Sequence, residues 1–270
     1  MVFCTVNVHL AQDADSLKPS KKHNFTFHWG YNRSAYTKSD LRMKGVGYDY
    51  TIHNVIAHDR PSQFDPKIYF NLFKLSIPQF NTRIGYQINE KWCISVGYDH
   101  MKYVVDEYQT ANISGYIDST ASTKYAGTYD NTPTVLDDRD FLHFEHTDGL
   151  NYITVDADYT SKLWTSKNTK FNLEHRGGMG LGALYPRTDV NIFGTENANI
   201  FNLAGVGVSL QSQIRFNLWK FLYIQGSIKS GGIWMPKITT SGFNGDFASQ
   251  KFLFIEGFWV IGFRLGFGEK

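Results

Sequence analysis

The chain has 270 residues, of which 42% are apolar and 19% charged, and its formal net charge is +2. No uncharged apolar run reaches about 18 residues, which excludes a bundle of transmembrane helices. The near-balance of acidic and basic residues gives no reason to expect a nucleic-acid partner. Aromatic residues make up 16% of the chain, with 24 Gly but only 7 Pro. This composition excludes a disordered chain and favours strands over helices.

The two cysteines, Cys4 and Cys93, are the next constraint. Neither belongs to a CxxC or Cys/His pattern with metal-ligand spacing. A disulfide framework and a cysteine-based zinc site are therefore excluded. We expect no cofactor.

The N-terminal segment precedes the patterned part of the chain. Residues 1–11 (MVFCTVNVHLA) have the length of a secretory signal core but lack a charged region in front. Residues 12–22 (QDADSLKPSKK) form a polar linker. We expect 1–22 to be a signal-peptide remnant and linker, with an ordinary disordered N-terminus as the alternative. Residues 23–270 then form one domain.

From residue 23 onward, apolar and polar residues alternate with a period of two. In 204–218 the even positions are mostly apolar, and the odd positions are Gly or polar. Such alternation indicates strands with one apolar and one polar face. At about 3.3 Å per residue this segment would span roughly 50 Å, far longer than strands of most soluble sheets. We expect nine clear strands, at 24–36, 41–55, 77–88, 92–105, 141–160, 170–185, 202–218, 220–234 and 251–267.

The lengths of the connections decide between a soluble sandwich and a membrane barrel. A sandwich would expose the polar faces to water, whereas a barrel would turn them toward its lumen and the apolar faces toward lipid. Three connections are very short, at 89–91, 166–169 and 218–220. Those alternating with them are long, at 105–140, 186–200 and 236–249. This pattern is typical of outer-membrane barrels, so we predict a single closed antiparallel transmembrane β-barrel of about ten strands, with a range of about eight to twelve.

The tenth strand would come from 66–73 or from 108–128. A barrel of this size has an interior largely filled by side chains. We therefore expect a charge-filled lumen in which acidic and basic residues pair with one another. The expected members of this lumenal network are Arg83, Asp99, Asp156, Asp158, Glu174, Arg176, Arg215, Lys229, Glu256 and Arg264.

The end of the chain gives an independent indication. Alternating apolar positions run through the last expected strand to Phe267. Here the chain resembles Gram-negative outer-membrane proteins, whose final strand ends in an aromatic residue that the barrel-assembly machinery recognises. The resemblance implies that Phe267 is this assembly signal, although three residues follow it.

The segment 141–151 (FLHFEHTDGLN) concentrates residues that could carry chemistry. Counted from Asp156, the alternation predicts that His146 and Asp148 face the lumen, and that His143 and Glu145 face outward or lie above the membrane. Metal binding by His143, His146 and Asp148 is not expected, because neighbouring positions face opposite ways. We expect no metal site here.

In a catalytic interpretation, His146 would act as a general base and Asp148 would orient it. Glu145 is a further catalytic candidate. The spacing resembles the His-x-Ser-Asn of outer-membrane lipid A deacylases. In this chain, however, Asp148 stands in place of the Ser and Gly149 in place of the Asn. Because the nucleophile is missing, we favour a structural cluster at the outer rim of the barrel.

Several phrases taken together are similar to a group of outer-membrane β-barrel proteins from Bacteroidota-type Gram-negative bacteria. They are WGYNRSAYTKSD, AHDRP, IPQFN, GYDHMKY and FLHFEHTDGLNY. The resemblance covers residues 23–267 and implies a barrel in the bacterial outer membrane. It implies no activity, because none is attached to that group.

These observations lead to an expected function. We expect a structural, accessory or surface-binding barrel, whose loops 56–76 and 105–140 contact a protein partner. The alternatives are a lipid A or phospholipid hydrolase centred on His146, and a narrow, porin-like passive channel. Other expected partners are outer-membrane lipid and the barrel-assembly machinery.

Overall fold

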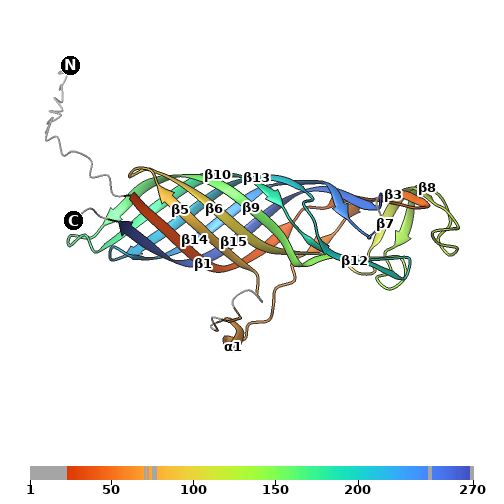
Figure 1. The fold of residues 1–270 in the computed structure, drawn as a ribbon, viewed down its shortest axis with the longest axis horizontal. Helices are drawn as coiled ribbons and strands as arrows, with labels where there is room; N and C mark the ends of the chain where they lie inside the picture. Colours follow the sequence, from red (N-terminus) through yellow and green to blue (C-terminus); the bar gives the residue numbers. More distant parts are fainter. Residues whose placement is uncertain (1–22, 70, 72, 75–77, 243–244, 268–270) are drawn as a thin grey trace, which may run out of the picture.

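The computed structural model describes residues 23–69, 71, 73–74, 78–242 and 245–267, and Figure 1 shows the fold. Within these residues, eight antiparallel strands pair in a ring, in which β1 bonds to β5 on one side and to β15 on the other. The ring strands are β1 (His23–Tyr36), β5 (Phe80–Gln87), β6 (Trp92–Val105), β9 (Leu142–Thr165), β10 (Phe171–Leu184), β13 (Gly205–Leu218), β14 (Leu222–Thr239) and β15 (Phe247–Phe267). The chain is an antiparallel β-barrel, as the alternation predicts.

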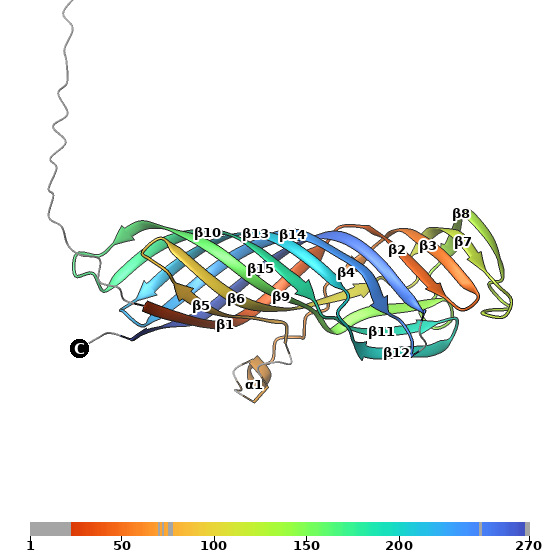
Figure 2. The same cartoon turned by 45° about the horizontal axis from the view of Figure 1, so that its top comes forward.

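The other elements form an extension beyond one end of the ring, which Figure 2 shows opposite the C-terminus. They are β2 (Ser39–Gly45), β3 (Tyr48–Val55), β4 (Ala57–His58), β7 (Thr110–Ile117), β8 (Gly127–Val135), β11 (Arg187–Ile192) and β12 (Thr195–Phe201). β15 continues past the ring and pairs with β2, after which β3, β7 and β8 follow in order. On the other side, β11 pairs with β9, and β12 with β11. A single helical turn, α1 (Pro66–Tyr69), lies outside the barrel wall (Figure 1).

Strand number is where expectation and structure differ most. Eight ring strands lie at the lower end of the expected range, two fewer than ten. The segment 66–73 contributes α1 instead of a strand, and 108–128 contributes to the hairpin of β7 and β8 outside the ring. The expected single strand 41–55 is also wrong. It is the hairpin of β2 and β3, which turns at Gly47, where the backbone has a φ of 79°.

The connections at the two ends of the ring differ in length, as expected. The short turns join β5 to β6, β9 to β10 and β13 to β14, and they lie at the end where β1 begins beside the end of β15. The connections at the opposite end, apart from that between β14 and β15, hold the elements of the extension. No helix in the described part of the chain is long and apolar enough to cross a membrane.

The outer face of the ring is apolar. Val206, Ile214 and Ile224 are 50%, 47% and 46% exposed, so the apolar positions of the long strands point away from the interior. Aromatic residues such as Trp92 and Trp219 lie at the turns of the terminal end. An exposed apolar wall with aromatic residues at its edge is what a lipid bilayer covers.

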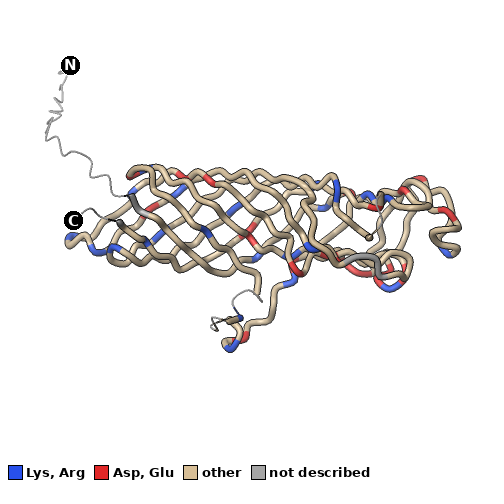
Figure 3. Tube along the Cα trace, in the orientation of Figure 1, with Lys and Arg blue, Asp and Glu red and all other residues tan. Residues whose placement is uncertain are grey.

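The interior has two levels of different chemistry. Near the termini it holds buried charged and amide side chains. Toward and inside the extension it holds a hydrophobic core, which includes Met101, Tyr103, Leu150 and Phe252. Because of this core, charged residues fill only the half of the lumen nearer the termini. Figure 3 shows acidic and basic residues both on the ring strands and in the extension.

Candidate functional site

The centre of the lumenal network is formed by Arg83 and Lys229 with two carboxylates. Arg83 donates from Nη2 to Asp99 Oδ2 at 3.2 Å and from Nε to Asp156 Oδ2 at 2.9 Å. Lys229 Nζ lies 2.6 Å from the same Asp99 oxygen. All four side chains are at most 4% exposed. Two cations, from β5 and β14, therefore neutralise two anions, from β6 and β9. These ion pairs link the four strands across the lumen.

Two further ion pairs lie nearer the terminal end. Arg176 Nη2 and Asp158 Oδ2 are 3.4 Å apart, and Asp158 also accepts hydrogen bonds from Gln211 and Gln213 at 2.7 and 3.0 Å. Arg264 donates to Glu174 at 3.0 Å. This last pair lines an open cavity of about 190 Å³ at the mouth of the barrel.

Arg215 and Glu256 are buried in the lumen but form no ion pair among the described residues, so the expected pairing is wrong for these two. The Arg215 guanidinium lies 3.9 Å from the centre of the Tyr223 ring and donates to Gln225 at 2.8 Å. Glu256 accepts a hydrogen bond from Asn32 at 2.6 Å. A stacked arginine and an amide-bonded carboxylate satisfy part of their charge without a counterion.

His146 and Asp148 do not form the expected inward pair. His146 is fully buried against the rings of Tyr103 and Phe144, whose centroids are 5.7 and 5.1 Å away. Neither ring nitrogen has a hydrogen-bond partner in the described structure. Because burial disfavours the charged imidazolium, it lowers the pKa of His146 to about 3. A weak base without an orienting group is unsuited to general-base catalysis.

A β-bulge explains the placement of Asp148. Met101 pairs with Leu150, but Tyr103 pairs with His146, so β9 contains extra residues at this point. Gly149 in the bulge has a φ of 121°. The bulge turns Asp148 outward, where its side chain is 56% exposed and pairs with Arg187 at 2.9 Å. The expected lumenal orientation of Asp148 is therefore wrong, because the alternation is interrupted between it and Asp156.

Glu145 and His143 lie on the other face of β9, and both are held by polar contacts. Glu145 is buried and accepts a hydrogen bond from Arg60 at 2.7 Å. His143 Nδ1 lies 2.5 Å from Asp138. Asp189 of β11 pairs in register with Glu145. Asp189 is missing from the sequence-based candidates, although the alternation of Val190 and Ile192 with polar residues could have indicated a strand in this connection.

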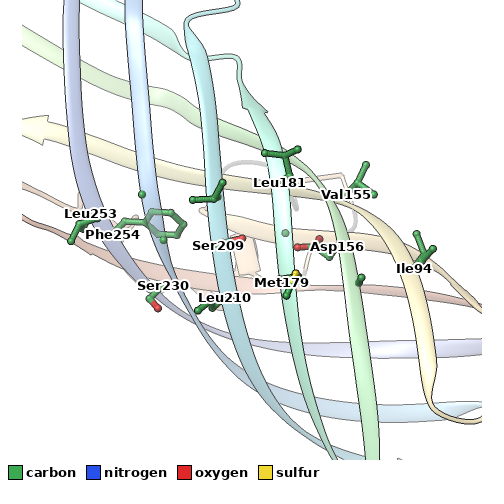
Figure 4. A pocket seen from close by; sticks show the side chains of 15 residues that line it. Ile94, Val155, Asp156, Met179, Leu181, Ser209, Leu210, Ser230, Leu253 and Phe254 are labelled. Carbon is green, nitrogen blue, oxygen red and sulfur yellow. The ribbon is translucent and has the colours of Figure 1, made fainter.

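A hollow inside the lumen and a groove on the outer wall differ in size and in what they face. A space of about 10 Å³ lies deep in the lumen among Arg176, Arg215 and their neighbours, and it is at most large enough for one water molecule. A groove of about 800 Å³ is lined by outward-facing side chains such as Val155, Met179 and Leu253 (Figure 4). This groove forms part of the apolar outer wall.

No protein-family profile matches the chain, and no curated protein matches it. Solved structures similar to it include Ail, the attachment invasion locus protein of Yersinia pestis, with 12% identity and a TM-score of 0.35 over 90% of this chain and 99% of that one. Neisserial surface protein A has 11% identity and a TM-score of 0.33, over 90% and 97% of the two chains. The outer membrane protein OprG of Pseudomonas aeruginosa has 8% identity and a TM-score of 0.36, over 92% and 98%. Likeness at this level carries no argument about activity.

Proposed function

We propose that the protein is a bacterial outer-membrane barrel with a structural, accessory or surface-binding role, and that its extension carries that role outside the cell. The observation that supports this most is the filled interior: ion pairs occupy one half and a hydrophobic core the other. Among the described residues, a lumen filled in this way leaves little aqueous space, which supports a role for the outer surface. The exposed apolar wall supports membrane insertion.

The membrane orientation is part of this proposal. Bacterial barrels carry short turns on the periplasmic side and long connections on the outside. The extension is built from the long connections and has its own hydrophobic core, so it is a folded platform rather than a set of loose loops. Segments 56–76 and 105–140 contribute to this platform and are the proposed contacts for a protein partner. Phe267, at the end of β15, is the proposed signal for the barrel-assembly machinery.

The finer alternatives have less support. Membership of the Bacteroidota-type group rests on the resemblance of the sequence phrases. A hydrolase centred on His146 would need a nucleophile and an orienting partner, and His146 has no hydrogen-bond partner in the described structure. A passive channel would have to pass through the hydrophobic core.

Cysteine labelling in intact cells tests the proposal. In a chain with Cys4 and Cys93 replaced by Ser, Val46→Cys places a thiol at the tip of the β2–β3 hairpin, where Val46 is 79% exposed. Lys91→Cys places one in a short turn at the opposite end. We expect a membrane-impermeant maleimide to label Val46→Cys in intact cells and Lys91→Cys only after permeabilisation. The reverse pattern, or labelling of neither in intact cells, would contradict the proposal.

A further inference from the structure

His143, Glu145 and Asp189 form a cluster on the outer face of the extension that the proposed function does not use. His143 and Glu145 are two residues apart on β9 and share a face, and Asp189 lies opposite Glu145 on β11. One ligand atom of each, an imidazole nitrogen or a carboxylate oxygen, lies within 4.8 Å of the others. Adjacent antiparallel strands thus present three potential metal ligands at one point.

The imidazole of His143 is oriented by a fourth residue. Its Nδ1 donates to Asp138 Oδ1 at 2.5 Å, which leaves the lone pair on Nε2. Nε2 lies 3.7 Å from Glu145 Oε2, so this lone pair faces the cluster. A carboxylate that holds one imidazole nitrogen while the other binds metal is the usual second layer of a metal site.

The charges at the cluster are unbalanced. Asp138, Glu145 and Asp189 are carboxylates, and Arg60 is the cation in ion-pair contact with them among the described residues. A single guanidinium leaves two negative charges, which is the charge that a divalent cation neutralises. Arg60 itself is 55% exposed, so it can leave Glu145 without leaving a cavity.

A fourth oxygen is available beside the cluster. Asn191 of β11 pairs with His143 across the strands and follows Asp189 by two residues, so it shares its face. Its Oδ1 is buried and has no hydrogen-bond partner in the described part of the chain. A buried, unpaired carbonyl oxygen is costly unless a ligand or water satisfies it.

We propose that His143, Glu145 and Asp189 bind a divalent transition-metal ion of the Zn²⁺ type, with Asn191 Oδ1 or water in the fourth position. One imidazole nitrogen with carboxylate oxygens suits Zn²⁺, whereas Ca²⁺ and Mg²⁺ prefer oxygen ligands alone. The bound ion joins β9 to β11, and Asp138 in the connection before β9 orients one of its ligands. The site does not depend on the proposed function.

Calorimetric titration of the full chain in detergent micelles with ZnCl₂ tests the site, using protein without a polyhistidine tag. We expect saturable binding of one ion per chain. His143→Ala and Asp189→Asn should each weaken binding at least about 10-fold, and Asp138→Asn about 10-fold. Arg60→Ala should leave binding unchanged or make it tighter, because it removes a competing cation from Glu145.

His53→Ala is the matched control. His53 also lies on a strand of the extension, beside the single carboxylate of Asp40 at 3.5 Å, and its Nε2 bonds to Ser114. This variant should bind Zn²⁺ like the wild type. Absence of saturable binding to the wild type would overturn the site, as would an equal loss in His53→Ala. Equal affinity for Ca²⁺, unaffected by His143→Ala, would overturn the assignment to a transition metal.

Discussion

Arg83 is the residue on which the lumenal network depends most, because its guanidinium bridges Asp99 and Asp156. Replacing it by Leu leaves two buried carboxylates with Lys229 alone. We expect Arg83→Leu to lower the free energy of unfolding by about 3–5 kcal/mol. Urea unfolding of the purified barrel in micelles measures this.

Arg215→Leu is the comparison for this prediction. Arg215 is as deeply buried as Arg83, but it has no carboxylate partner within ion-pair distance among the described residues. Its replacement leaves no buried carboxylate without an ion-pair partner. We therefore expect Arg215→Leu to lower the free energy of unfolding clearly less than Arg83→Leu does. Equal costs for both variants would show that arginine packing, not charge pairing, stabilises the lumen.

His146 is a polar side chain inside an apolar cluster. Both ring nitrogens lack partners in the described structure, so their desolvation is not compensated. We expect His146→Leu to raise the free energy of unfolding by about 1 kcal/mol. A lower urea midpoint for this variant would mean that an unobserved hydrogen bond, such as one to a buried water, satisfies the imidazole.

The same residue allows a test of the hydrolase alternative. Cells that express the wild type and cells that express His146→Ala should have identical lipid A by mass spectrometry, because His146 lacks an orienting partner. Loss of an acyl chain with the wild type alone would make His146 a catalytic base. Expression levels of the two proteins need to be matched for this comparison.

At the scale of elements, glycine permits the close approach of β1 and β15 where the ring closes. A Cβ on Gly30 would overlap the backbone carbonyl of Trp259. We expect Gly30→Ala to reduce the fraction of chain that migrates as a folded, heat-modifiable barrel on a gel. Gly257→Ala is the matched control in β15, because a Cβ there meets no described atom within 4 Å. Normal folding of Gly30→Ala would contradict this account.

The alternation of apolar and polar residues predicts the ring strands well, because one face of each strand is constrained by lipid and the other by the lumen. The expected strand 92–105 has the same bounds as β6. The turn at Gly47 is marked by a change of parity, because the apolar positions are odd up to Met43 and even from Tyr48 onward. The expected single strand 41–55 overlooks this change. The alternation does not reveal bulges, since the extra residues in β9 change the direction in which Asp148 points without changing the composition around it.

For the candidate sites too, the alternation within a strand predicts some features and not others. The buried positions of Arg83 and Asp156 follow from the alternation within single strands. The partners of Glu145 do not, because Arg60 and Asp189 come from different connections, and their proximity depends on the pairing of β9 with β11. Long-range pairing of this kind is not encoded in any local pattern.

At the scale of the whole molecule, the hydrophobic core of the extension closes one end of the lumen. We expect the protein to show no steady conductance in planar lipid bilayers, because an apolar, packed constriction excludes hydrated ions. The rings of Tyr103 and Phe252 stack in this core with centroids 4.9 Å apart. The double variant Tyr103→Ala, Phe252→Ala should be leaky if it inserts, whereas steady ohmic currents from the wild type would contradict a closed lumen.

The final strand has a second set of partners beyond the ring. Phe254 to Phe267 of β15 pair with β1, and the preceding residues from Phe247 to Gln250 pair with β2. β1 and β2 therefore each have a partner in a strand that comes much later in the sequence. Contacts of such long sequence separation form slowly, because the intervening chain must first be ordered. Ring closure and docking of β2 are thus coupled in time, and until β15 arrives the β2–β3 hairpin has an unpaired edge that needs protection during biogenesis.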